Sequence, residues 1–230
     1  MRPFPSRKKV TEKDNFSYLL FSLFFLLLSS AVVDQFFAHS LIGQSLVIAF
    51  TVISMLIGVW SLRSSRYAFN TVLGIVVATI IISAIIIILD RTDFEFIHLL
   101  LMLYFFIITL RLAAQQALFS GHVTHNSIVG SICIFLLLGL IWVMLYLLLA
   151  EFTPNAFAGL EPRSWQENFP DFIYFSFVTL TTLGFGDLLP ISPLARFLVY
   201  MEAIVGVFYM AIVVSSLVGA GTSNIQEKSS

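Results

Sequence analysis

The sequence predicts an all-α membrane protein with six transmembrane helices and one shorter apolar helix that enters the membrane without crossing it. Of its 230 residues, 59% are hydrophobic, against the ~45–50% typical of soluble globular domains. Charged residues make up 11%, although about a quarter of a soluble domain is charged. In addition, the apolar residues gather into runs of the ~20 residues that a helix needs to cross a bilayer. Together these observations favour a membrane as the solvent of this chain.

The apolar runs follow one another along the chain with short polar connections between them. They cover approximately residues 16–33, 41–62, 69–89, 94–112, 128–152 and 194–221. The first run follows Arg7, Lys8 and Lys9, so a cleaved signal peptide with a small-residue site at residues 29–31 is an alternative. The length of this run and the further apolar segments behind it favour an uncleaved first span.

A seventh apolar segment, residues 169–180, is about a dozen residues long and therefore too short to cross. Such a segment suits a re-entrant helix that is buried in protein. Pro170 is favourable at the first position of a helix and Asp171 in its first turn, so we expect the helix to begin there and to end near Leu180 or Thr181.

The placement of charge predicts the orientation, because loops rich in Lys and Arg stay in the cytoplasm. With the N-terminus inside, the cytoplasmic segments hold nine basic residues: Arg2, Arg7, Lys8, Lys9, Lys13, Arg63, Arg66, Arg111 and Lys228. The outer segments hold Arg91, Arg163 and Arg196. Nine acidic residues fall outside: Asp34, Asp90, Asp93, Glu95, Glu151, Glu161, Glu167, Asp171 and Asp187. We therefore expect a multi-pass protein of the plasma membrane with both termini in the cytoplasm and an acidic outer face.

Several function classes are disfavoured by composition. The net charge of −1 provides no basic excess for binding nucleic acid. The single cysteine, Cys133, excludes an intrachain disulfide framework and sites with several thiolates. The sequence contains no Ser/His/Asp set, metal-binding motif or phosphate loop, so we expect neither an enzyme nor a bound cofactor.

The segment that follows the short helix has an unusual pattern. Gly184 and Gly186 alternate with Leu183 and Phe185. This alternation permits backbone conformations in which successive carbonyl groups turn the same way. A plain glycine turn is the alternative, but irregular backbone at membrane depth is tolerated only where it is buried in protein or lines a cavity.

Residues 179–187, T-L-T-T-L-G-F-G-D, resemble the signature loop of potassium channels. With the order of span, pore helix, filter and span, the resemblance covers about residues 128–221, whereas the first four spans match six-span channels only in number and order. It implies that backbone carbonyls replace the water around a potassium ion. The implied filter residues are Thr182, with its hydroxyl, Leu183, Gly184, Phe185 and Gly186. Because each chain carries one such loop, it also implies a homotetramer in membrane lipid.

The resemblance further divides the chain and assigns supporting residues. Residues 1–126 would form a peripheral domain like a degenerate voltage sensor, 127–222 the pore domain, and 223–230 a short cytoplasmic tail. Support of the filter is expected from Thr179, Thr181, Asp187, Tyr174 and Val178.

Two departures from the family pattern concern that support. Phe185 stands where most potassium channels have Tyr, and it lacks the hydroxyl that would bond to a pore-helix aromatic such as Tyr174 or Phe175. Val178 stands where some bacterial channels have a Glu that pairs with the aspartate after the filter, so Asp187 must find another partner or face solvent. We expect altered filter stability with selectivity retained.

The last span contains Glu202 and Gly206 one turn apart. Gly206 resembles the hinge glycine of the inner helix, although close helix packing through a small residue is an alternative. Glu202 is an ionisable group within a span, which suggests either pairing beneath the filter or a role in sensing pH or ions. The resemblance also places Val207, Met210, Val214 and Val218 towards the conduction path, where an apolar ring would gate by dewetting.

The fourth span lacks the charge that steep voltage sensing needs. Residues 94–112 contain one basic residue, Arg111, whereas a steep sensor carries several, each worth ~2.3 kcal/mol per 100 mV. We expect weak or no conventional voltage dependence. His122 and His125, in the linker of residues 121–127, either bias a gate by protonation or are merely solvated.

The sequence therefore predicts a potassium-selective channel that conducts passively, with itself, lipid and potassium ions as partners. A weakly selective cation channel, a potassium transporter and a regulatory subunit are the alternatives. A transporter would show internal repeats and paired broken helices, and no second copy of the filter segment is present.

Overall fold

The computed structural model describes residues 15–37, 40–61, 66–89, 94–118, 125–160 and 164–215. Its long helices are α1 (Asn15–Phe37), α2 (Leu41–Ser61), α3 (Arg66–Leu89), α4 (Glu95–Leu118), α5 (His125–Phe152) and α7 (Pro193–Tyr209). The last of these continues as a short π-helical segment, η2 (Met210–Val214). Within the described residues, these six helices are long and apolar enough to cross a membrane, which confirms the predicted multi-pass helical architecture.

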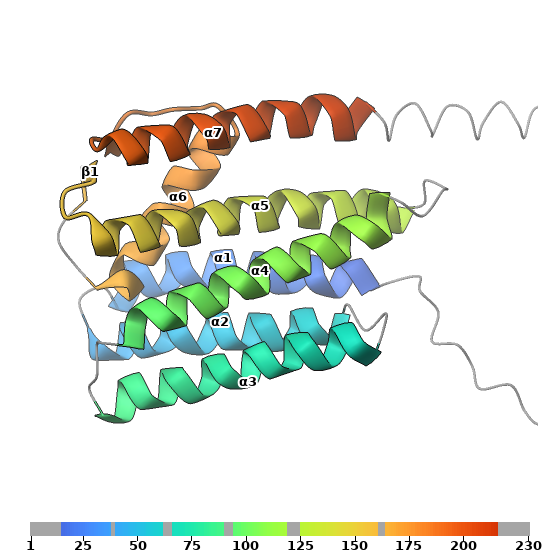
Figure 1. The fold of residues 1–230 in the computed structure, drawn as a ribbon, viewed down its shortest axis with the longest axis horizontal. Coiled ribbons are helices and arrows are strands. Elements are labelled where there is room, and N and C mark those ends of the chain that lie inside the picture. The colour runs from blue at the N-terminus through green and yellow to red at the C-terminus, as the bar shows by residue number, and fades with distance from the viewer. Residues whose placement is uncertain are drawn as a thin grey trace, which may run out of the picture.

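The long helices run side by side along the long axis of the molecule (Figure 1). α1 begins and η2 ends at the same end of the bundle. The shorter helix α6 (Trp165–Leu180) starts beside the other end of α1 and α2, crosses behind α5 and reaches α7. This path joins the first helices of the chain to the last one.

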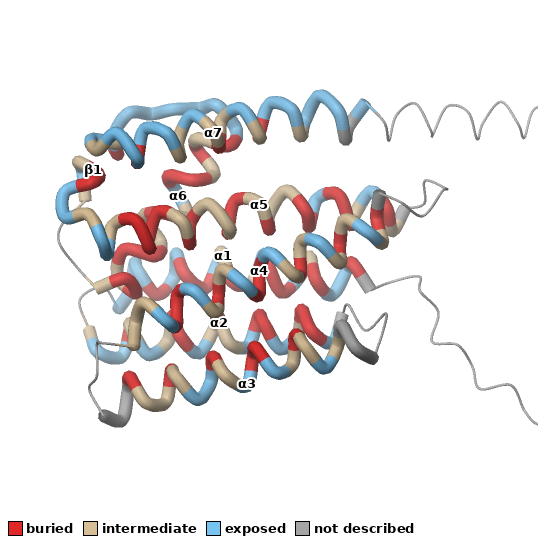
Figure 2. The backbone as a smooth tube through the Cα atoms, in the orientation of Figure 1, coloured by how far each residue is buried: buried red, intermediate tan, exposed pale blue. Residues whose placement is uncertain are grey.

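The core lies where α5 packs against α4, α1 and α6. Its largest fully buried side chains include Phe106 of α4, Tyr146 of α5, and Phe169 and Phe172 of α6. The most apolar stretch of α5 is 61% buried, whereas that of α7 is only 17% buried. Figure 2 shows this contrast, since most of α7 lies uncovered along one edge of the molecule.

Two short strands that the all-α prediction did not include connect the end of α5 to the start of α7. β1 (Phe157–Ala158) follows α5 and pairs antiparallel with β2 (Leu189–Pro190), which precedes α7. The backbone N–H of Ile191 also donates to the carbonyl of Ala156 at 2.8 Å. α7 then starts with Ser192 as its N-cap, whose hydroxyl accepts from the backbone N–H of Ala195 at 3.1 Å, and with Pro193 in the first turn.

The prediction for the start of the short helix was wrong. α6 begins at Trp165 rather than at Pro170, and Pro170 lies inside the helix. The backbone carbonyl of Ser164 accepts from the N–H groups of Glu167 and Asn168, both at 3.1 Å, so the first turn forms before the proline. The apolar count missed this turn because it is polar, although Ser164 and Glu167 follow the S-x-x-E pattern of helix starts.

Candidate functional site

The segment after α6 has the alternating backbone that its glycines suggested. Gly184 and Gly186 have φ angles of 57° and 81°, and Thr182 has a φ of 61°. The intervening Leu183 and Phe185 are not among the residues with positive φ. Alternation between the two hands of the backbone turns successive carbonyls of an extended strand towards one side. Thr182 is the unexpected member, because a β-branched residue rarely adopts this conformation.

The carboxyl end of α6 holds the start of this segment. The carbonyl of Val178 accepts from the N–H of Leu183 at 2.9 Å and is 3.4 Å from the N–H of Gly184. The N–H of Thr182 donates to the carbonyl of Thr179 at 2.9 Å. The hydroxyl of Thr181 donates to the carbonyl of Phe177 at 2.6 Å. The structure thus places Thr179, Thr181 and Val178 at the base of the segment.

Residues 181–187 are exposed in the single chain. The side chains of Leu183 and Phe185 are 63% and 68% exposed. The segment lies alongside the uncovered face of α7 (Figure 2). No other part of the described chain covers it.

The supporting partner of Asp187 is Tyr174. The hydroxyl of Tyr174 donates to Asp187 Oδ2 at 2.7 Å, and the tyrosine ring is parallel to that of Phe185, with 6.3 Å between centroids. The backbone N–H of Leu188 donates to Asp187 Oδ1 at 3.0 Å. Phe185 has no hydroxyl group with which to bond to α6. The hydrogen bond from Tyr174 to Asp187, two residues after Phe185, connects α6 to the segment instead.

This bond changes the ionisation of both partners. The hydrogen bond from Tyr174 lowers the pKa of Asp187 below its ordinary value. The same bond raises the pKa of Tyr174, because removing its proton would place two negative charges together. The ionised carboxylate and the neutral phenol are thus the pair at neutral pH.

Glu202 of α7 is fully buried, and its carboxyl oxygens form hydrogen bonds with side chains from α5 and α6. The hydroxyl of Tyr146 in α5 donates to Glu202 Oε2. Ser176 Oγ in α6 lies 2.6 Å from Glu202 Oε1 and 2.9 Å from the carbonyl of Gly139. Tyr146, Ser176 and Glu202 are each 0% exposed. The structure places Tyr146 and Ser176 beside Glu202, two residues that the sequence analysis did not single out.

One turn further along α7, Gly206 packs against the end of α6. A Cβ atom at this position would overlap the carbonyl oxygen of Leu180. The contact favours close packing, which was the alternative to a hinge. Four residues after Gly206, the α-helix gives way to the π-helical segment η2. The residue just before η2 is Tyr209, and its hydroxyl donates to the carbonyl of Ser131 in α5.

The other residues predicted along the conduction path are partly described. Val207 and Met210 are both 54% exposed, on the uncovered side of α7. The backbone of Val214 belongs to η2. Val218 and His122 lie outside the described residues, and of His125 only the backbone, at the start of α5, is described.

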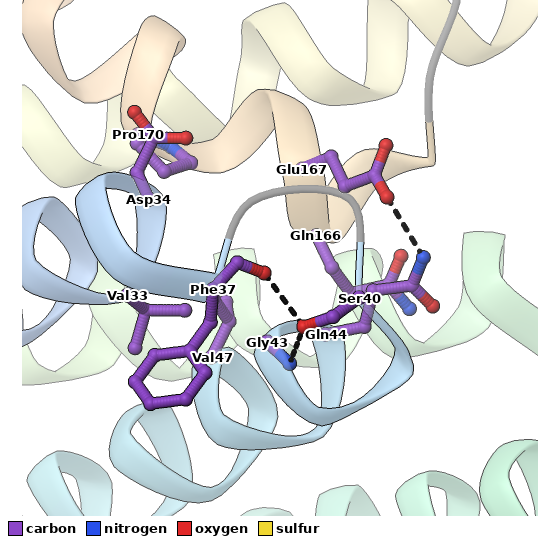
Figure 3. Close-up of a pocket in the computed structure, with 10 residues that line it drawn as sticks. All are labelled: Val33, Asp34, Phe37, Ser40, Gly43, Gln44, Val47, Gln166, Glu167 and Pro170. Carbon is purple, nitrogen blue, oxygen red and sulfur yellow. Dashed lines mark hydrogen bonds between the residues drawn. The ribbon is translucent and has the colours of Figure 1, made fainter.

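A small cavity lies apart from this segment, between the end of α1, the start of α2 and the first turns of α6 (Figure 3). Gln44 Nε2 of α2 donates to Glu167 Oε1 of α6 at 3.0 Å across its edge. Asp34 and Gln166 also line it. These contacts tie the amino end of α6 to the peripheral helices, while its carboxyl end carries the alternating segment.

Acidic side chains gather towards one end of the bundle. Six described acidic residues lie towards the end that holds β1: Asp34, Glu95, Glu151, Glu167, Asp171 and Asp187. Arg111 lies exposed towards the other end of α4.

Comparison with known proteins places the alternating segment within a recognised domain. Residues 131–222 match the family model described as "ion channel". The inward rectifier potassium channel Kirbac3.1 of Paramagnetospirillum magnetotacticum is 33% identical over 82 residues, which are 36% of this chain and 25% of that protein. The potassium voltage-gated channel protein shk-1 of Caenorhabditis elegans is 40% identical over 58 residues, which are 25% of this chain and 11% of that protein.

These similarities are confined to part of each protein. The matched segments span a quarter or less of the length of the two relatives. No solved structure matches the chain. Residues 131–222, which hold most of α5 together with α6, the alternating segment and α7, are thus the part of the chain that is similar to ion channels, and the two relatives named above are potassium channels.

Proposed function

We propose that the protein is a potassium-selective channel that conducts passively through a pore formed by four copies of the chain. The observation that carries this proposal is the alternation of positive φ at Thr182, Gly184 and Gly186 in a segment held at the end of a half-length helix. A row of carbonyls on one side of a strand is the ligand set that replaces the hydration shell of a potassium ion.

The proposal assigns the coordinating oxygens to the backbone from Thr182 to Gly186 and to the hydroxyl of Thr182. α6 has 16 residues and is therefore about 24 Å long, short of the ~30 Å hydrocarbon core. Its carboxyl end, with partial negative charge, would point into the membrane and favour a cation there. The acidic groups at the outer end of the bundle would concentrate cations before entry.

Four copies are proposed because one chain provides a single side of the ion path. The alternating segment is exposed, and α7 presents an apolar surface that includes Phe197, Ile204, Val207 and Phe208, each 44% exposed or more. Cyclic symmetry would cover both features by bringing four equal segments around one axis.

Weak voltage dependence is part of the proposal. α4 contains a single basic residue, Arg111, in the last third of the helix. Charge transfer of the size needed for steep gating requires several such residues in each subunit. We therefore propose that another stimulus, or none, opens the pore, with the chain in the plasma membrane and both termini in the cytoplasm.

Recordings from the purified protein in planar bilayers test the function. With unequal potassium and sodium on the two sides, the reversal potential is expected to follow the potassium equilibrium. The Boltzmann slope is expected to correspond to less than about one elementary charge per channel. Arg111→Gln should leave that slope unchanged, since the proposal gives this residue no gating charge.

Other outcomes identify the alternatives. A reversal potential that is insensitive to exchanging potassium for sodium would indicate a weakly selective cation channel. Flux that saturates as in a transport cycle, without unitary current steps, would indicate a transporter. Absence of both current and flux from the reconstituted chain would indicate a regulatory subunit.

A further inference from the structure

Glu202 occupies the point where three helices of the ion channel domain meet. Three oxygen–oxygen contacts follow one another in series. Glu202 takes part in the first two, with Tyr146 and with Ser176, and the third joins Ser176 to the carbonyl of Gly139. They join α7 to α5 and to α6 in one chain of hydrogen bonds. Ser176 precedes Thr179, the first residue of the potassium-channel-like motif, by less than one helical turn.

The number of protons in this chain is decided by its geometry. Each of the three contacts needs one proton between its two oxygens. The hydroxyls of Tyr146 and Ser176 each provide one, and a backbone carbonyl provides none. If the Ser176 hydroxyl donates to Gly139, the proton between Ser176 and Glu202 must come from the carboxyl group. If it donates to Glu202 instead, two acceptor oxygens remain facing each other 2.9 Å apart, at Ser176 and Gly139.

The surroundings of Glu202 also favour the neutral acid. Among the described residues, its hydrogen-bonding partners are hydroxyl groups, and none of them is basic. The titratable group that faces it is Tyr146 from α5, whose ring packs against Phe157, Phe172 and Phe175. An ionised carboxylate that is removed from water without a cation is costly to bury, and such groups take up a proton instead.

We propose that Glu202 is a protonated carboxylic acid in the folded protein and acts as a positioning residue that fastens the inner helix α7 to the pore helix α6. In this form Glu202 Oε1–H donates to Ser176, Ser176 donates to the carbonyl of Gly139, and Tyr146 donates to Glu202 Oε2. Every contact then has one proton, and no buried charge remains.

The same face of α7 supplies a second contact one turn away. Ser176 and Leu180 are four residues apart on α6, and their partners Glu202 and Gly206 are four residues apart on α7. Residues four apart lie on one face of a helix. The acid and the glycine are therefore two successive contacts of one interface between α6 and α7, directly behind the start of the alternating segment.

Loss of the proton changes this interface. With two protons left for three contacts, one pair of oxygens has no proton between them: either Glu202 Oε1 and Ser176 Oγ, or Ser176 Oγ and the carbonyl of Gly139. The two oxygens of that pair would repel each other or draw water into the contact. α6 would lose its bond to α7 or to α5, and the segment at its end would lose support. We therefore expect conductance to fall as the pH is raised, a consequence that rests on the proposed channel function.

Infrared spectroscopy of the reconstituted protein tests the protonation without any need for conduction. At about pH 7 an exposed glutamate is ionised, so a carbonyl stretch of a neutral carboxylic acid reports a buried one. We expect this band in the wild type, its downward shift in D2O, and its loss in Glu202→Gln. Glu151→Gln, which changes an exposed glutamate at the end of α5, is the matched control and should retain the band.

Glu202→Gln is also the conservative variant for function, because an amide reproduces the acid. Its carbonyl accepts from Tyr146 and its NH₂ donates to Ser176, but it does not titrate. We expect wild-type selectivity and folding in this variant, with the alkaline fall in conductance abolished. Ser176→Ala should shift the acid band, because the acid loses the oxygen to which it donates.

The two arms separate this inference from the proposed function. Absence of the acid band at neutral pH, or its persistence in Glu202→Gln, overturns the assignment whether or not the protein conducts. An identical pH response in the wild type and in Glu202→Gln overturns the positioning role, as does a flat wild-type profile. Failure to conduct with the acid band present counts against the channel proposal alone.

Discussion

At the scale of single residues, the hydroxyl of Tyr174 connects α6 to the segment that follows it. It reaches Asp187 at 2.7 Å while its ring stacks on Phe185. The bond spans 13 positions of the chain and encloses the whole alternating segment between its two ends. Both residues are exposed in the chain, so the bond responds to the pH of the solution that reaches it.

Tyr174→Phe removes this donor and keeps the ring. The bond lowers the pKa of Asp187, so its stabilising effect is fully present above the ordinary range of the carboxyl and is lost as the pH falls through the lowered pKa. In the variant this pKa rises, and we expect conductance to decline at a higher external pH than in the wild type, with selectivity retained. Recording over an acidic pH series measures the shift.

Tyr18→Phe is the control for that experiment, because Tyr18 is an exposed tyrosine of the peripheral helix α1. It should follow the wild-type pH series. If the acidic limb of Tyr174→Phe coincides with that of Tyr18→Phe, the hydroxyl does not support the segment.

Single residues also mark the limit of sequence reasoning. The glycine pattern at residues 184 and 186 predicted the backbone alternation, because glycine alone adopts positive φ freely. The partners of Glu202 were not predictable, since Tyr146 lies 56 positions away and Ser176 lies 26 positions away, on different helices. A single tyrosine in the apolar fifth span was the available signal, but it gives no indication of what it contacts.

At the scale of elements, α6 and α7 approach closely because Gly206 has no side chain. Its position against the carbonyl of Leu180 leaves no room for a Cβ atom. The sequence left a hinge and a packing role open at this glycine, and the choice depends on the path of a helix 26 positions earlier. Hydropathy cannot provide that path, because it does not show which faces of two helices meet.

Gly206→Ala is expected to destabilise the protein by about 1–3 kcal/mol, since overpacking forces the helices apart. Thermal unfolding in detergent should show a lower midpoint, and the conductance should fall as the contact with α6 is strained. Gly74→Ala is the matched control, because a Cβ at Gly74 in the middle of α3 meets nothing within 4 Å. That variant should be neutral or more stable by up to about 1 kcal/mol. Equal midpoints for the two variants would contradict the packing role.

The elements themselves were largely predictable from hydropathy. The limits of α2, α3, α4 and α5 differ from the predicted ones by a few residues, since apolar runs of this length have one stable form in a bilayer. The start of α6 was missed because its first turn consists of polar residues that are buried against protein instead of lipid. Gln166 and Asn168 in this turn are 4% and 9% exposed. A count of apolar residues does not show which polar residues are buried in the fold.

At the scale of the whole molecule, the uncovered face of α7 predicts an assembly. Native mass spectrometry of the purified protein is expected to show a species of four times 25.8 kDa. Ile204→Trp, on the uncovered face of α7, should weaken this species, because a larger side chain prevents close approach of the copies. Ile53→Trp in α2 is the control, since Ile53 is equally exposed, at 42% against 44%, on a peripheral helix. A dominant monomer for the wild type would contradict the assembly.

The proposed assembly of four chains around the exposed segment has a genetic consequence. A path that is shared by four chains fails when any one of them is faulty, so a subunit with a defective segment would act in a dominant manner. With equal expression of normal and defective copies and random mixing, about one assembly in sixteen would consist of normal chains alone. A substitution at Gly184 or Gly186 should therefore suppress most of the current when it is co-expressed with the wild type. A protein that kept its ion path within one chain would lose only half.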